Sequence, residues 1–206
     1  AAGRIAAAEL EDRRVELLGP EVEGRTGVVV SLVDGEGERT MASDRGVSPK
    51  LAPDELRADS FRGCDVLYVS GYALLAPPAA EAALRAGSLA RATGASVSVD
   101  LSSWSAIRAA GPARFRSRLE ELAPDIVFGG EAEVQMLGGD LPAPTTVLKH
   151  GARGFSVDGT RYAARASAVT DTTGAGDALA AGFLVGGPDL ALDAAERCVA
   201  GVGAMP

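Results

Sequence analysis

Short β-rich runs alternate with amphipathic helical segments along most of this chain, and that alternation limits the folds open to it. The runs that predict strands cover residues 64–69, 96–100, 125–128 and 145–149. Helical periodicity falls between and after them, over residues 79–93, 112–122, 131–137, 174–185 and 190–204. Because strands that alternate with helices build βαβ units, we predict a three-layer α/β/α fold around a mostly parallel sheet. Ligands of such a sheet bind beyond the carboxyl ends of its strands.

Smaller elements flank this alternating region. They are a helix at 2–10, two strands at 27–34 and 38–42 with a turn at 35–37, and a hairpin over 154–157 and 161–164. The chain has 206 residues, about 1.4 times the length of an average domain. We therefore expect a single domain over 1–206, with the early strand pair as a small β appendage.

The composition excludes several classes of protein. A net charge of −8 without a basic block argues against nucleic acid as a partner. No uninterrupted apolar run approaches the about 18 residues that span a bilayer, so we expect no membrane partner and a cytoplasmic location. Cys64 and Cys198 lack metal-ligand spacing, which suits a reducing compartment. Because His150 is the only histidine, catalysis would rest on carboxylates, backbone amides and Lys or Arg.

One segment carries recognisable chemistry, the run DTTGAGD at 171–177, which a small-residue helix follows. Glycines let the backbone approach a ligand closely, and the amides of Gly174, Ala175 and Gly176 would lie at a helix N-terminus, where they suit a phosphate or an oxyanion. Asp177, in the first turn of that helix, could then accept a proton from a hydroxyl during phosphoryl transfer. The alternative is an ordinary helix start with an acidic first turn. For Gly176 we expect no tolerance of a side chain.

The seven residues together with that helix resemble the C-terminal signature of the ribokinase-like sugar kinases, the PfkB carbohydrate kinase family. The resemblance extends over nearly the whole chain, because further segments occur in the family's order. These segments are 26–30 with 37–40, 65–72, 125–128 and 147–154. It implies a ribokinase-like fold with a β lid at about 26–42. It also implies an ATP-dependent enzyme that phosphorylates a hydroxyl of a sugar or related small molecule.

The resemblance also implies roles for single residues. Asp177 matches the catalytic base, and Gly174, Ala175 and Gly176 match the anion hole. The nucleotide site would include Lys149, Gly151, Gly154 and Glu133, and Glu133 would help to place Mg²⁺. Asp171 and Thr173 match the region where many members hold a monovalent cation such as K⁺. Asp100, at the end of a buried strand, is the candidate contact for the substrate.

Two departures from the family pattern matter. Gly130 replaces the Asn of the Asn-x-x-Glu motif, which removes a side-chain amide that orders water. The family's first strand and its Gly-Gly segment have no counterpart, so we expect a domain that lacks its N-terminal part. These departures leave a non-catalytic nucleotide- or sugar-binding relative as an alternative. A nucleoside kinase is another, because that branch of the family shares the signature. The resemblance further implies a homodimer formed through the lid.

The two basic residues that follow the lid have two possible interpretations. Arg45 and Lys50 either contact an anionic group of the substrate or are solvated charges. Beside the predicted nucleotide site, His150 either contacts the nucleotide or is a simple packed or solvent-facing histidine. Trp104 is expected to be a packing residue near the surface or at a helix start.

Overall fold

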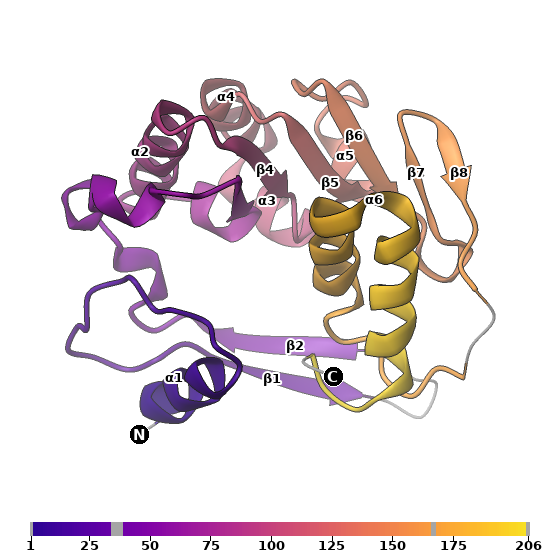
Figure 1. Cartoon of the computed structure of the whole chain (residues 1–206), viewed down its shortest axis with the longest axis horizontal. Coiled ribbons are helices and arrows are strands. Elements are labelled where there is room, and N and C mark those ends of the chain that lie inside the picture. Colours follow the sequence, from indigo (N-terminus) through magenta and orange to yellow (C-terminus); the bar gives the residue numbers. More distant parts are fainter. Residues whose placement is uncertain (1, 34–38, 166–167, 205–206) are drawn as a thin grey trace.

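A six-stranded sheet forms the centre of the protein, whose computed structural model describes residues 2–33, 39–165 and 168–204. Its strand order is β3-β4-β5-β6-β7-β8 (Figure 1). The strands are β3 (Val66–Ser70), β4 (Ser96–Asp100), β5 (Ile126–Gly130), β6 (Thr145–Lys149), β7 (Phe155–Val157) and β8 (Thr160–Tyr162). The first four are parallel, and β7 and β8 add an antiparallel hairpin at one edge. The predicted mostly parallel sheet is confirmed.

Helices cover both faces of this sheet. They are α2 (Ala79–Ala92), α3 (Trp104–Ala110), α4 (Pro112–Leu122), α5 (Glu131–Met136) and α6 (Ala175–Ala200). Helix α1 (Ala2–Asp12) has no buried residue and lies apart from this sheet (Figure 1). Single 3₁₀ turns are η1 (Ser48–Lys50), η2 (Pro53–Glu55), η3 (Ala58–Phe61), η4 (Gly71–Leu74) and η5 (Gly151–Arg153). Val127 belongs to the core beneath α2 and α4, whereas its neighbour Phe128 belongs to the core beneath α6. Since successive residues of a strand point to opposite faces, the three predicted layers are present.

The last helical segment, α6, is two helices rather than one. Gly186 and Gly187 leave helical backbone, and Pro188 opens the second half. The two halves lie side by side in Figure 1, and a Cβ at Gly182 would lie 2.8 Å from the Cα of Ala191. Taken as one segment, α6 is long and apolar enough to cross a membrane, with a mean hydropathy of 1.3 in its most apolar part. Each half alone is well short of the about 20 residues that a span needs.

A separate two-stranded sheet stands below the main one in Figure 1. It consists of β1 (Val28–Val33) and β2 (Arg39–Asp44), which are antiparallel and pair Val30 with Ala42. This strand pair is the β appendage that the sequence predicts at about 26–42. The predicted turn at 35–37 lies outside the described residues.

Candidate functional site

The loop from Asp171 to Gly174 has a fixed shape because Asp171 organises it. Its Oδ1 accepts hydrogen bonds from the backbone N–H and the hydroxyl of Thr173, at 2.8 and 2.7 Å. Its Oδ2 accepts one from the backbone N–H of Gly203 at 3.0 Å, which ties the loop to the segment after α6. Both oxygens of this carboxylate therefore have structural partners. The monovalent cation at Asp171 and Thr173 stays a prediction.

Gly174 is the residue of this loop that must be glycine. Its φ is +78°, in the left-handed region, and a Cβ there would lie 2.8 Å from backbone atoms of Ala204. The sequence predicts that Gly176 tolerates no side chain, but its φ is not in the left-handed region. A Cβ at Gly176 would instead lie 3.3 Å from the Nζ of Lys149. The steric constraint at Gly174 therefore shapes the loop, whereas Gly176 keeps open the space in front of the lysine.

The amides at the start of α6 form a smaller group of donors than the sequence predicts. The N–H of Ala175 donates to the carbonyl of Thr172 at 3.3 Å. Within the described residues, the N–H groups of Gly174 and Gly176 have no protein acceptor. Two of the three predicted amides thus remain available at the positive end of a helix dipole, where an anion is stabilised.

Lys149 reaches this helix terminus from the end of β6, and Asp100 holds it there. The Nζ of Lys149 lies 2.6 Å from the Oδ2 of Asp100, whose side chain is only 3% exposed. The Oδ1 of Asp100 accepts the backbone N–H of Ser102 at 2.9 Å. With both oxygens engaged, Asp100 positions the ammonium beside Gly176. It lines neither of the cavities described below, and its substrate role stays a prediction.

Tyr68 joins the site from β3, although the sequence does not single it out. Its hydroxyl donates to the Oδ1 of Asp177 at 3.5 Å. Burial and the nearby negative charges of Asp100 and Asp177 raise the pKa of the Tyr68 hydroxyl well above its usual value. Two carboxylates far apart in the chain therefore face one phenol, and Asp177, an exposed residue, lies at the open side of the group.

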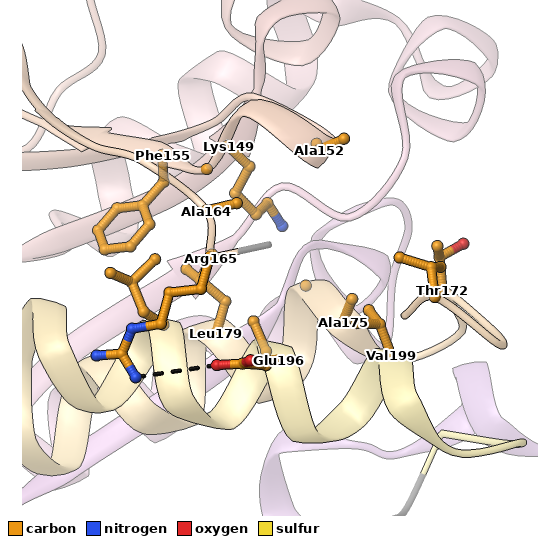
Figure 2. Close-up of a pocket in the computed structure, with 16 residues that line it drawn as sticks. Lys149, Ala152, Phe155, Ala164, Arg165, Thr172, Ala175, Leu179, Glu196 and Val199 are labelled. Carbon is orange, nitrogen blue, oxygen red and sulfur yellow. Dashed lines mark ion pairs between the residues drawn. The ribbon is translucent and has the colours of Figure 1, made fainter. Parts of the chain in front are cut away.

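A cavity of about 570 Å³ opens between β6, the β7–β8 hairpin and α6 (Figure 2). Its polar end holds Lys149, Gly151, Gly154, Thr172, Ala175 and Gly176, and its apolar wall includes Phe155, Leu179, Leu192 and Val199. Arg165 and Glu196, both in the lining, form an ion pair, with Nη1 and Oε2 at 3.9 Å (Figure 2). The volume is within the range of small-molecule sites. Three residues predicted for a nucleotide, Lys149, Gly151 and Gly154, are among those that line it.

A second cavity, of about 810 Å³, lies between the strand pair and the main sheet. Residues of β2, of η4 with Leu75 beside it and of the start of α3 line it, namely Met41, Ser43, Arg45, Tyr72, Leu75, Ser103, Trp104, Ser105 and Ala106. Thr172 lines both cavities. The Asp171–Gly174 loop therefore lies where the two spaces meet.

Glu133 is held by backbone groups beside the site. Its Oε2 accepts the N–H of Gly130 at 2.9 Å, and its Oε1 accepts the N–H of Trp104 at 3.1 Å. Within the described residues, no group of three or more Asp, Glu, His or Cys could hold a metal ion. A single carboxylate, that of Glu133, fits a Mg²⁺ that nucleotide phosphates and water would also hold. It does not fit a Mg²⁺ held by the protein alone.

His150 packs rather than facing either cavity. Its ring nitrogens lie 2.7 Å from the Oε1 of Glu131 and 3.0 Å from the hydroxyl of Ser156. The hydrogen bond with His150 and the charge of Arg153 lower the pKa of the Glu131 carboxyl. Both ring nitrogens of His150 therefore have protein partners, which supports the interpretation of His150 as a packing residue.

The model of the pfkB family carbohydrate kinases matches residues 1–203. An ATP-dependent ribose-1-phosphate kinase of Halopiger xanaduensis is 30% identical over 219 residues, covering 95% of this chain and 68% of that protein. A 5-dehydro-2-deoxygluconokinase of Shouchella clausii is 32% identical over 167 residues, 71% of this chain. This chain covers only 51% of the length of that second relative.

The fold has close counterparts among solved structures. The crystal structure of adenosine kinase from Sinorhizobium meliloti superposes with a TM-score of 0.89 at 24% identity. The match covers 100% of this chain and 71% of the adenosine kinase. At that identity the likeness shows the ribokinase-like fold that the sequence predicts, and it does not show the acceptor.

Proposed function

The chain belongs to the pfkB family of carbohydrate kinases, and on that premise we propose that it transfers the γ-phosphoryl group of ATP to a hydroxyl group of a sugar or related small molecule. One observation carries the proposal. A carboxylate, an ammonium and two unpaired amides gather at the carboxyl edge of the sheet, beside a loop that two cavities share. In sheets of this kind that edge is where substrates bind.

In this account ATP occupies the smaller cavity and the acceptor occupies the larger one. Asp177 takes the proton of the acceptor hydroxyl while the oxygen of that hydroxyl bonds to the γ-phosphorus. The bond from the γ-phosphorus to the bridging oxygen breaks, and ADP leaves with the electron pair. A carboxylate is suited to the base role because the loose transition state of phosphoryl transfer leaves little covalent chemistry to the protein. Tyr68 orients Asp177 through its hydroxyl.

The remaining groups offset charge on the transferring phosphoryl. The amides of Gly174 and Gly176 donate to its oxygens, and the ammonium of Lys149 neutralises part of its charge. Asp100 keeps that ammonium in place before ATP binds. Bound Mg²⁺ would supply further neutralisation of the phosphates, with Glu133 as its predicted protein partner. K⁺ near Asp171 and Thr173 belongs to the same proposal.

The acceptor class is narrowed by comparison with relatives. Two curated relatives are named for ribose 1-phosphate and for 5-dehydro-2-deoxygluconate, and the structural neighbour is an adenosine kinase. Both of these curated relatives are at least 30% identical to this chain, and they support a sugar or sugar derivative over a nucleoside. Gly130, in place of the family's Asn, is the observation that keeps a non-catalytic relative as the second candidate.

Acceptor-dependent release of ADP tests the function. We expect the purified protein with ATP and Mg²⁺ to release ADP when a sugar or sugar derivative is added, and to release little with adenosine. The panel includes ribose, ribose 1-phosphate, 5-dehydro-2-deoxygluconate and adenosine. Turnover with adenosine alone would make the protein a nucleoside kinase. Binding of ATP without turnover on any acceptor would favour the non-catalytic relative.

We also propose that the protein forms a homodimer through the strand pair. Met41 and Ser43 of β2 line the larger cavity, so the opposite face of the pair is turned away from it. That face has three exposed apolar side chains on β1, Val28, Val30 and Leu32. A two-stranded sheet with an uncovered apolar face is marginal on its own, and a second copy would cover it.

Sedimentation velocity tests the dimer. We expect Val30→Glu to raise the dimer dissociation constant at least about tenfold, because it buries a charge in the interface. Val185→Glu, a matched change at an 81% exposed position of α6, should leave it unchanged. A wild-type protein that sediments as a monomer at every concentration would contradict the proposal.

We place the protein in the cytoplasm. Cys64 and Cys198 are both free thiols, and Cys198 is buried. Burial raises the pKa of the Cys198 thiol, as do the charges of Asp171 and Asp177. Two cysteines that form no disulfide are typical of a reducing compartment.

A further inference from the structure

The larger cavity carries a positive charge in a lining that is otherwise apolar or hydroxyl-bearing. Of the residues that line it, Arg45 is the only one with a charged side chain. No Asp or Glu lines the cavity within the described part of the chain. Because the whole protein has a net charge of −8, this local positive charge does not reflect the average surface.

The guanidinium of Arg45 is held in place without a carboxylate partner. Its Nη2 donates to the backbone carbonyl of Tyr72 at 3.2 Å. Its Cζ lies 5.4 Å from the centre of the Tyr72 ring, a cation–π geometry. No ion pair of Arg45 occurs among the described residues, whereas the nearby Arg25 pairs with Asp44 at 3.1 Å. Most of the five N–H donors of Arg45 are thus available to a ligand.

Hydroxyl groups line the cavity around this arginine. Ser43 lies on β2, and Ser103 and Ser105 lie at the start of α3 with their hydroxyls 3.0 Å apart. Thr172 lines the same cavity next to the Asp171–Gly174 loop. A planar guanidinium binds the oxygens of a phosphate or carboxylate in pairs, and serine hydroxyls suit the remaining oxygens of a sugar.

We propose that the larger cavity binds an acceptor with an anionic oxyacid substituent, a phosphate or a carboxylate, and that Arg45 recognises that substituent. The proposal rests on the proposed kinase function, because it takes this cavity to be the acceptor site. The phosphorylated hydroxyl lies at the Thr172 end of the acceptor, next to Asp177. The anionic group lies at the Arg45 end, under the strand pair. Lys50 does not line the cavity.

Direct binding to matched probes tests this recognition. Calorimetry compares ribose 1-phosphate with ribose, and gluconate with glucitol, so that the two pairs separate a phosphate from a carboxylate. We expect the wild-type protein to bind at least one anionic probe about tenfold or more tightly than its neutral partner, as a charge-assisted hydrogen-bonded pair implies. Arg45→Gln should reduce that ratio to about twofold or less. Arg25→Gln, which makes the same charge change at a position outside the cavity, should preserve it.

Three results would overturn the proposal: equal affinity of the wild-type protein for anionic and neutral probes, no binding of either anionic probe, or an unchanged preference in Arg45→Gln. Parallel measurement of ADP release distinguishes failure of the proposed recognition by Arg45 from failure of the kinase function. An Arg45-dependent preference without transfer from ATP leaves the recognition intact and removes the kinase. Phosphoryl transfer to neutral sugars, with no effect of Arg45→Gln, keeps the kinase function and removes the recognition by Arg45.

Discussion

Asp177→Asn lowers kcat by about 10²–10⁴-fold, the range typical of a positioned proton acceptor. The amide keeps the size of the side chain but cannot take the proton of the acceptor hydroxyl. Asp177 is exposed, and its Oδ1 accepts a hydrogen bond from the Tyr68 hydroxyl at 3.5 Å. The loss of its charge from the first turn of α6 costs less than about 1 kcal/mol of unfolding free energy. Steady-state ADP release and thermal unfolding, measured on the same sample, check both parts.

A matched control lies in the same kinked segment. Asp189→Asn removes an exposed carboxylate of the same kind from the start of the second half of α6. Neither Asp177 nor Asp189 lines a cavity, but Asp189 lies beyond the break at Gly186 and Gly187, away from the loop at 171–174. It should leave kcat within about twofold of the wild-type value. An Asp177→Asn protein that is as active as this control would remove Asp177 from the base role.

Lys149→Met has the second large effect, and it acts on both activity and stability. The substitution removes the charge that faces the transferring phosphoryl, so kcat should fall about 10²–10³-fold. It also leaves the carboxylate of Asp100 buried without its cation. Breaking such a pair costs about 3–5 kcal/mol, and the lower end applies because the Lys149 side chain is 22% exposed. Chemical denaturation and ADP release measure the two effects.

The double variant Lys149→Met with Asp100→Asn separates the two roles. An asparagine carries no charge and retains an oxygen for the N–H of Ser102. Most of the lost unfolding free energy should therefore return, while kcat stays as low as in the single variant. Recovery of kcat together with stability would show that Lys149 serves only to neutralise Asp100.

Much of the fold follows from local signals in the sequence. The predicted ranges 96–100, 112–122 and 145–149 coincide with β4, α4 and β6. Turn residues bound these segments closely, such as Pro112 at the start of α4 and Pro124 just after its end. The break in the last helical segment is also visible in the sequence, because two glycines and Pro188 interrupt its periodicity. Helix α3, with seven residues, is too short for a periodic signal, and only Ser103 marks its start.

The composition of the site depends on strand register, which the sequence does not specify. Ser70, Asp100 and Phe128 are paired across neighbouring strands, so they share the face that α6 covers. Tyr68 lies two residues before Ser70, on that same face. Lys149 meets Asp100 across 49 positions of sequence. The motif at 171–177 predicts the base and part of the anion site, whereas Tyr68 and the Lys149–Asp100 pair require the assembled sheet.

The central claim is that this site moves a phosphoryl group from ATP to a hydroxyl, with Asp177 as the base. Phosphorus NMR of the reaction mixture tests it directly, since it resolves ATP, ADP, inorganic phosphate and a new phosphoester in one spectrum. We expect one phosphoester formed per ADP with the wild-type protein and almost none with Asp177→Asn over the same time. Formation of ADP with inorganic phosphate alone, or of the phosphoester at an undiminished rate by the variant, would contradict it.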